Sequence, residues 1–150
     1  MLGRLNKIPH EVDKIRLFDF YLSAPYAIKL FRTNSRKMLS ERNSILNKLS
    51  RYDEIDNSKF LFYEAKILQI TVLSYLSAKN IISTEEYKNN RVVINLSNSN
   101  PIIDDIKDKQ KSIPMDVMNL IENELQDMPL LGNDGLKDRS NLLEYRYDAL

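Results

Sequence analysis

The chain has 150 residues, of which 43% are hydrophobic and 29% charged, as expected of a single soluble domain with its own core. It contains no cysteine, which excludes disulfides, thiolate metal sites and a cysteine nucleophile. The net charge of +1 hides an asymmetry: residues 1–51 hold 11 Lys or Arg against 4 Asp or Glu, and residues 52–150 hold 11 against 17. This pattern suits one face to phosphates or acidic partners, although an ordinary solvated face explains it equally.

The N-terminal region predicts an amphipathic helix. We expect Pro9 to occupy its first turn and the helix to end near Ser23, because Pro25 disfavours helical geometry in the residue before it. Its apolar stripe consists of Val12, Ile15, Phe18 and Leu22. His10 is the only histidine, and we expect it to be structural or solvent-exposed. No signal-peptide pattern precedes this helix, so a cytoplasmic location is expected.

Residues 29–51 form a basic segment, with seven basic residues and one acid, and a helix is predicted within it from about Ser35 to Ser50. Phosphates are the natural partners of such a segment. The candidate nucleic-acid-binding residues are Arg32, Arg36, Lys37, Lys48 and Arg51. Arg42 falls in the apolar arc of the predicted helix, where it either forms an internal ion pair or contacts a partner protein.

The stretch from Phe60 to Ile82 is the longest apolar-rich run in the chain, and no glycine or proline interrupts it. Its polar ends and Gln69 exclude a membrane span. A helix that is apolar around most of its circumference is normally buried by several neighbours. We therefore expect this stretch to be the central core helix, ended by Asn80 in a left-handed conformation.

The alternating residues from Arg91 to Ser97 predict one strand, with 81–83 as the nearest candidate for its partner. A helix followed by a two-stranded ribbon is typical of a winged-helix unit. The predicted fold is therefore mainly α with a short β-ribbon, a winged-helix-like helical domain over residues 1–128. A further helix is expected to open at Pro101.

Residues 114–128 predict another helix, ended by Pro129. One face of it carries Met118, Ile121, Leu125 and Met128. Because methionine adapts to irregular surfaces, this stripe is a candidate partner-docking surface, and core packing is the alternative. Residues 129–150 are expected to form a C-terminal tail with at most one short helix, through Leu142 to Tyr147.

The sequence offers little for catalysis. Three glycines cannot build a phosphate-binding loop, no nucleophile elbow occurs, and one histidine provides no metal set. The carboxylates of Asp104, Asp105 and Asp108 are better explained by the positive end of a helix than by a metal site. We expect no enzyme activity, no metal and no cofactor.

Two segments carry a family resemblance: IRLFDFYLSAPYAI at 15–28 and FLFYEAKILQITVLSYLSAKNII at 60–82. Together they resemble the middle component of bacterial ABC-type three-component systems, of which the Lamassu anti-phage systems are members. The resemblance covers about 70 residues of apolar framework. It implies a non-catalytic subunit that bridges or regulates an SMC/RecN-like coiled-coil ATPase and an effector nuclease, with DNA in the assembled complex. Its framework residues, Phe18, Tyr21, Leu22, Phe62, Ile67 and Leu76, would determine the fold.

Two functions from different classes follow. The first is this accessory subunit of an anti-phage complex, with no membrane association. The second is a free-standing winged-helix DNA-binding regulator, which the basic segment would support. The apolar character of the helix that precedes the predicted ribbon favours protein contacts, because a helix that reads DNA is normally basic and polar.

Overall fold

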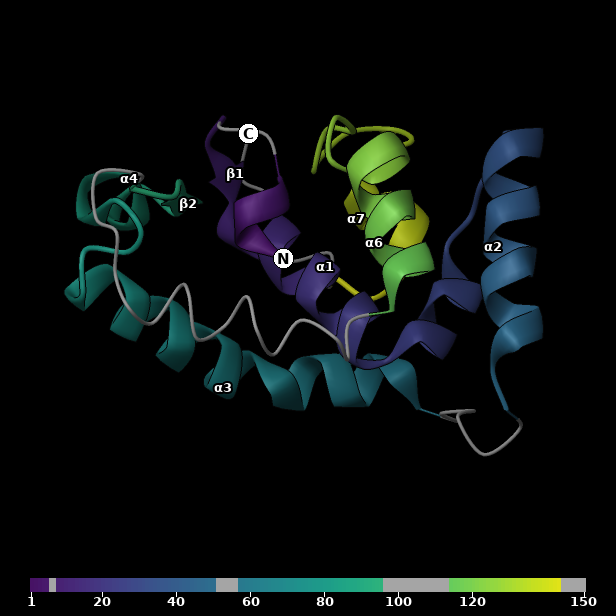
Figure 1. Ribbon diagram of the computed structural model, residues 1–150, viewed down its shortest axis with the longest axis horizontal. Coiled ribbons are helices and arrows are strands. Elements are labelled where there is room, and N and C mark those ends of the chain that lie inside the picture. The colour runs from purple at the N-terminus through teal and green to yellow at the C-terminus, as the bar shows by residue number, and fades with distance from the viewer. Residues whose placement is uncertain (6–7, 51–56, 96–113, 144–150) are drawn as a thin grey trace.

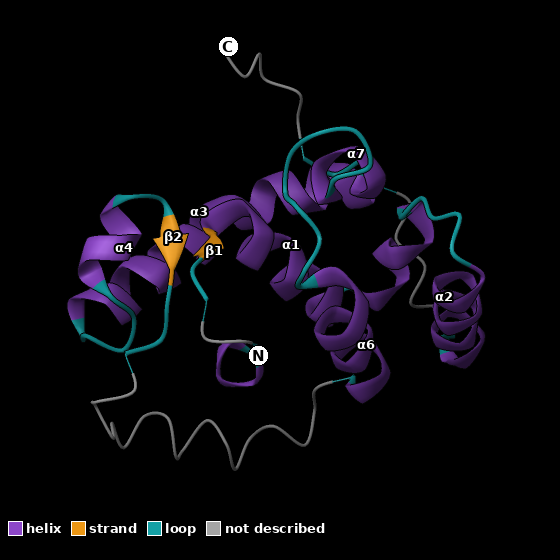
Figure 2. Ribbon diagram, turned by 90° about the horizontal axis from the view of Figure 1, so that it is seen from above, coloured by secondary structure: helices purple, strands orange, loops and turns teal. Residues whose placement is uncertain are grey.

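The computed structural model describes residues 1–5, 8–50, 57–95 and 114–143, and it is mainly helical with a two-stranded antiparallel sheet (Figure 1). In chain order the elements are η1 (Leu2–Arg4), β1 (His10–Glu11), α1 (Val12–Ser23), η2 (Pro25–Leu30), α2 (Arg36–Lys48), α3 (Ser58–Ala78), α4 (Thr84–Lys88), β2 (Arg91–Val92), α6 (Met115–Leu120), η5 (Ile121–Leu125) and α7 (Leu136–Ser140). Seen from above, α2 stands at one end of the molecule and α4 with the two strands at the other (Figure 2).

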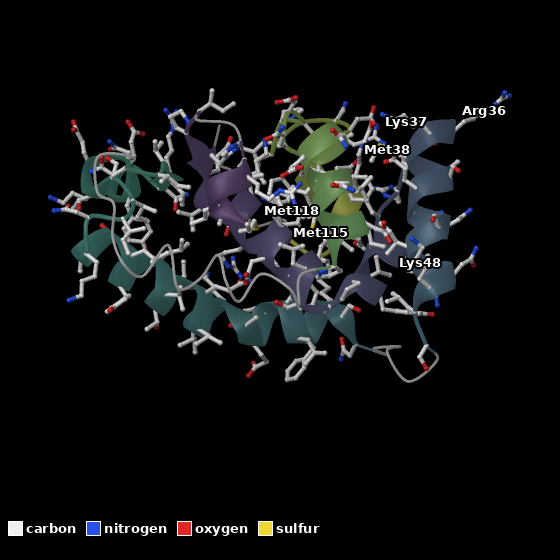
Figure 3. The ribbon with its side chains drawn as sticks, in the orientation of Figure 1. Arg36, Lys37, Met38, Lys48, Met115 and Met118 are labelled. Carbon is white, nitrogen blue, oxygen red and sulfur yellow. The ribbon has the colours of Figure 1, made fainter. Side chains whose placement is uncertain are left out.

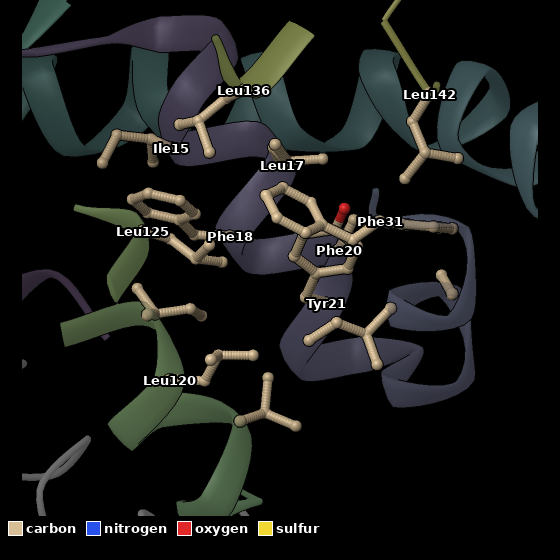
Figure 4. Packing of buried hydrophobic residues seen from close by; sticks show 14 of the residues in the cluster. Ile15, Leu17, Phe18, Phe20, Tyr21, Phe31, Leu120, Leu125, Leu136 and Leu142 are labelled. Carbon is tan, nitrogen blue, oxygen red and sulfur yellow. The ribbon is translucent and has the colours of Figure 1, made fainter. Parts of the chain in front are cut away.

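Helix α1 lies at the centre of the core. Eight of its twelve residues are buried, including two charged ones, Lys14 and Arg16. Its aromatic side chains Phe18, Phe20 and Tyr21 pack among leucines from the C-terminal third of the chain (Figure 4). The helix ends as predicted, since Ala24 before Pro25 leaves the helical region. It begins later than predicted, at Val12, because His10 and Glu11 pair with β2 as a strand. The central core helix of this fold is therefore α1, and the prediction for residues 60–82 is wrong on this point.

Helix α3 is predicted well in length but not in burial. The Asn57 side chain accepts a hydrogen bond from the Phe60 backbone N–H at 3.1 Å, and Asn80 (φ 55°) follows the helix end as expected. One side of α3 packs on α1 through Phe62, Gln69 and Leu73. The other side is exposed, and Ile67, expected to be a fold determinant, is 80% exposed.

The sheet pairs two segments that lie about 80 residues apart in the sequence. Strands β1 and β2 are antiparallel, with His10 opposite Val92 and Glu11 opposite Arg91. The predicted pairing of 81–83 is present as an isolated bridge between Ile82 and Ile94. The ladder partner of β2 is β1, which sequence reasoning placed at a helix start. Buried His10 thus has a structural position in this strand.

The C-terminal third closes the core. Helix α6 continues into the π-helical turn η5, and the two bury Met118, Ile121 and Leu125 completely. Beyond Pro129, Leu136 of α7 and Leu142 are also buried in the same cluster (Figure 4). Residues 129–143 therefore pack as part of the domain rather than as a separate tail. The helices predicted after Pro101 and through Leu142 to Tyr147 fall wholly or largely outside the described residues.

Helix α2 stands against α6 (Figure 1). It begins with the Ser35 side chain accepting a hydrogen bond from the Met38 backbone N–H, close to the predicted start. Only Met38 and Ile45 are buried, so a narrow apolar contact attaches this basic helix to the rest of the molecule.

Candidate protein-docking surface on helix α3

The exposed side of α3 carries a continuous row of large apolar side chains, which we call the α3 apolar face. Its two most exposed members are Ile67 (80%) and Leu68 (70%), at the middle of the helix. The face consists of Phe60, Leu61, Tyr63, Ile67, Leu68, Val72 and Tyr75. In Figure 1 this helix runs along one edge of the molecule, and among the described elements α1 lies on one side of it and none on the other.

The area of this face is large for a surface that only water covers. Its seven large residues lie on one side of a single helix and are each 40–80% exposed, whereas the largest apolar patch of a typical monomer is only ~300–600 Å². At roughly 25 cal/mol per Å² the exposure has a substantial free-energy cost that a protein partner would remove. An apolar patch of this size on a single helix marks an interaction surface.

The helix that carries the face is held firmly from behind. Gln69 accepts a hydrogen bond from the Arg16 Nε (3.1 Å) and donates to the Arg16 carbonyl (3.0 Å) and to Asp19 Oδ2 (2.9 Å). The Arg16 guanidinium lies 4.8 Å from the centre of the Phe62 ring, which meets Phe20 edge-on at 5.3 Å. These contacts present the α3 apolar face on a fixed platform, as a preformed docking surface requires.

Few polar groups interrupt the face. Glu64 and Thr71 lie along its middle, and Thr71 Oγ1 already donates to the Ile67 carbonyl of its own helix at 2.8 Å. At the C-terminal end, Lys79 places its ammonium 5.7 Å from the centre of the Tyr75 ring. At the N-terminal end, Asn57, Lys59, Phe60 and Tyr63 line a shallow hollow of about 330 Å³.

The predicted nucleic-acid-binding cations are mostly paired with carboxylates of the chain itself. Arg32 donates to Asp138 Oδ1 at 2.7 Å, Lys48 to Asp116 Oδ2 at 2.7 Å, and Lys37 to Glu124. The hydrogen bond that Lys37 donates to Glu124 raises the pKa of Lys37. Figure 3 shows Lys37 and Lys48 of α2 beside α6, with Arg36 pointing away from the molecule. Arg51 lies outside the described residues.

The geometry explains why the N-terminal region is basic. Lys37 and Lys48 join α2 to the acidic side of α6 and η5, and Arg32 joins the start of this region to α7. Among the described candidates, Arg36 is exposed and enters no ion pair that we observe within the described chain. Nucleic-acid binding by these residues stays a prediction. Three of the four described candidates form ion pairs with carboxylates of the same chain.

The predicted docking stripe is buried. Met118, Ile121 and Leu125 are fully buried, and Met128 is half-buried. These residues therefore pack in the core, which was the alternative to partner docking. Lys14 donates to the Met128 carbonyl at 2.7 Å, and burial lowers the pKa of that lysine. Arg42 is half-buried and donates to the Phe31 carbonyl at 2.7 Å, which is an internal contact, although not the ion pair that was expected.

Sequence reasoning thus placed the candidate docking surface on a stripe that the core buries. The exposed apolar face of α3 had a signal in the sequence, because residues 60–75 are apolar on both sides of the helix. Such a pattern fits a helix buried by its own chain and a helix buried by another protein equally well.

The described part of the chain offers no site for a metal ion. No group of three His, Asp or Glu side chains there could hold a metal ion.

None of the described helices is long and apolar enough to cross a membrane.

Comparison with known families gives one match. A family model described as "ABC-three component (ABC-3C) system Middle Component 5" matches residues 1–148. Searches of curated proteins and of solved structures found no match. The family match extends far beyond the two segments that carried the sequence resemblance and includes every described element.

Proposed function

Because the chain belongs to the Middle Component 5 family of ABC-three component systems, we propose that it is a non-catalytic accessory subunit of a bacterial anti-phage complex. In this proposal it links an SMC/RecN-like coiled-coil ATPase to an effector nuclease, as in Lamassu-like systems, in the cytoplasm. The observation that carries the proposal is the α3 apolar face, since a subunit that works through protein contacts needs such a surface.

The remaining geometry supports the same role. The Arg16–Gln69 contacts hold α3 in place, so the docking surface exists before a partner arrives. Helix α2 stands at one end of the molecule, and its exposed outer side is available to a second partner or to DNA in the complex (Figure 2). A linking subunit requires two such surfaces, one on α3 and one on α2.

We also propose that α3, α4 and the strand segments form a winged-helix-like unit. The bridge between Ile82 and Ile94 closes a loop that contains α4, and β1 extends this small sheet on the other side of β2. In such a unit α3 would occupy the position of the helix before the wing. Its apolar outer face suits a protein partner better than the phosphates of DNA.

The test is co-expression with the two components encoded beside this chain, with a tag on this chain only. The wild type is expected to retain both components. A double variant, Ile67→Glu with Leu68→Glu, is expected to lose at least one of them, because two carboxylates on the α3 apolar face cannot be buried without cost. Lys66→Glu, on the same helix but off the face, is the matched control and is expected to behave as wild type.

Two results would contradict the proposal. One is a tagged wild-type chain that is folded and retains neither component. The other is a double variant that is folded, as shown by circular dichroism, and retains both at the wild-type level.

A further inference from the structure

The geometry points to a second copy of this chain as the occupant of the α3 apolar face. We propose that two α3 helices pair antiparallel, with Leu68 of each copy beside Thr71 of the other. This inference rests on the proposed function only in taking α3 as a protein-docking surface. It goes further in naming the protein that covers it. The other components then dock on the pair, so a variant that disrupts the α3 apolar face loses them because it loses the pair.

The spacing along α3 is that of a helix that packs on another helix. Leu61, Leu68 and Tyr75 follow one another at intervals of seven, and Glu64, Thr71 and Ala78 each lie three residues later. Apolar residues repeating every seven positions form the seam of a coiled coil, in which side chains of one helix fill gaps on its partner. Every one of these six residues is exposed.

The small residues on this seam allow close approach. Thr71 and Ala78 oppose the larger Leu68 and Leu61 in an antiparallel pair, so at these positions a large side chain meets a small one. Burying Thr71 has little polar cost, because its hydroxyl is already satisfied by the Ile67 carbonyl.

The area is sufficient for a stable pair. Each copy would contribute the seam and the neighbouring members of the α3 apolar face, which are 40–80% exposed, and interfaces of standard size bury about 800 Å² per partner. The 21-residue helix is also long enough, at ~1.5 Å per residue, to provide three heptads of contact.

The charges select the antiparallel orientation. The seam carries one acid, Glu64, and ends at one base, Lys79, whose ammonium lies back over the ring of Tyr75. In the proposed register Glu64 of one copy faces Tyr75 of the other, so it meets that copy's Lys79, and the same pair forms again by symmetry. A parallel pair would instead place Glu64 beside Glu64.

The absence of cysteine in the chain makes a direct test simple. Two single variants, Leu61→Cys and Ala78→Cys, are prepared with different tags, mixed, and equilibrated in a glutathione redox buffer. In the proposed pair these two positions face each other, so a disulfide is expected between the two differently tagged chains. Within one variant the two cysteines lie far apart along the pair, so little homodimer should form.

Molecular mass in solution is the second measurement. The wild-type chain of 17.6 kDa is expected at twice its mass, and Glu64→Lys or Lys79→Glu is expected to weaken the dimer at least fivefold. Combining the two charge changes in one chain should restore it, because the pairs are then exchanged rather than removed. This rescue would not occur if the single changes acted only on folding.

Three outcomes overturn the inference: a wild-type chain that is monomeric up to about 100 µM, disulfides within single variants but not between them, or no rescue by the combined variant. The failure of the proposed function is distinguishable. A monomeric wild type that still loses its partner components when Ile67 and Leu68 are changed would refute the second copy and leave the accessory role intact.

Discussion

Tyr21 illustrates how much of this core depends on single side chains of α1. It is fully buried, meets Phe31 edge-on at a ring distance of 6.5 Å, and its hydroxyl has no hydrogen-bond partner within the described residues (Figure 4). Burial raises the pKa of this tyrosine above its usual value of 10.0. An unsatisfied buried hydroxyl reduces stability, and a phenolate in its place would reduce it more.

Tyr21→Phe is therefore expected to stabilise the protein by about 1 kcal/mol at pH 7. The advantage should grow above pH 10, because the unfolded tyrosine then loses its proton while the folded one keeps it, which lowers the stability of the wild type only. Urea unfolding at pH 7 and near pH 11, followed by circular dichroism, measures both effects. A variant less stable than wild type at both pH values would show that the hydroxyl has a partner.

Gln69 is the second residue whose replacement is informative, because it accepts a hydrogen bond from Nε of the buried Arg16, whose Nη1 donates to Asp13. Gln69→Leu keeps the size of the side chain but removes that acceptor, and it is expected to cost about 2–3 kcal/mol of the free energy of unfolding. Lys66→Gln, one turn away and exposed, should stay within about 0.5 kcal/mol of wild type. Equal stability of the two variants would mean that Arg16 finds another acceptor.

At the level of elements, α2 is attached by two buried side chains and by exposed ion pairs, and the two kinds of contact differ in strength. Met38→Ala is expected to cost about 2–4 kcal/mol, whereas Lys48→Ala should cost less than about 1 kcal/mol, because its pair with Asp116 is exposed to solvent and screened by salt. Chemical denaturation at low and high salt compares them. If Lys48→Ala were the costlier change, the ion pairs rather than the apolar contact would hold α2.

The positions of the helices were largely predictable, and their environments were not. Local signals such as Ser35, Asn57, Asn80 and the prolines set the ends of α1, α2 and α3 close to the predicted residues. The burial of α3 was mispredicted because apolarity shows only that a surface avoids water. It does not tell whether the same chain or another one provides the cover.

Long-range pairing was the other source of error. Arg32, Lys37 and Lys48 suggested a phosphate-binding surface because their carboxylate partners lie 68 to 106 positions away in the chain. The stripe of Met118, Ile121 and Leu125 suggested a docking surface because the aromatic side chains of α1 that cover it lie equally far away. In both cases residues distant in sequence supply the contacts, and periodicity within one helix cannot reveal them.

For the whole molecule, the ion pairs lead to a prediction about DNA. The isolated chain is expected to bind duplex DNA only weakly, with a salt dependence corresponding to at most about two phosphate contacts, because most of its candidate cations already face carboxylates. Fluorescence anisotropy over a range of salt concentrations measures the slope. A steep slope that Arg36→Ala flattens would favour the DNA-binding regulator predicted as the alternative.

The central claim is that the α3 apolar face is covered by protein in the working assembly. Ile67→Cys tests it most directly, since the natural chain has no cysteine and this position is 80% exposed. The rate of maleimide labelling is measured on the dilute chain alone and on the complex assembled with its partner components. We predict a rate at least tenfold lower in the complex, and an unchanged rate would contradict the account.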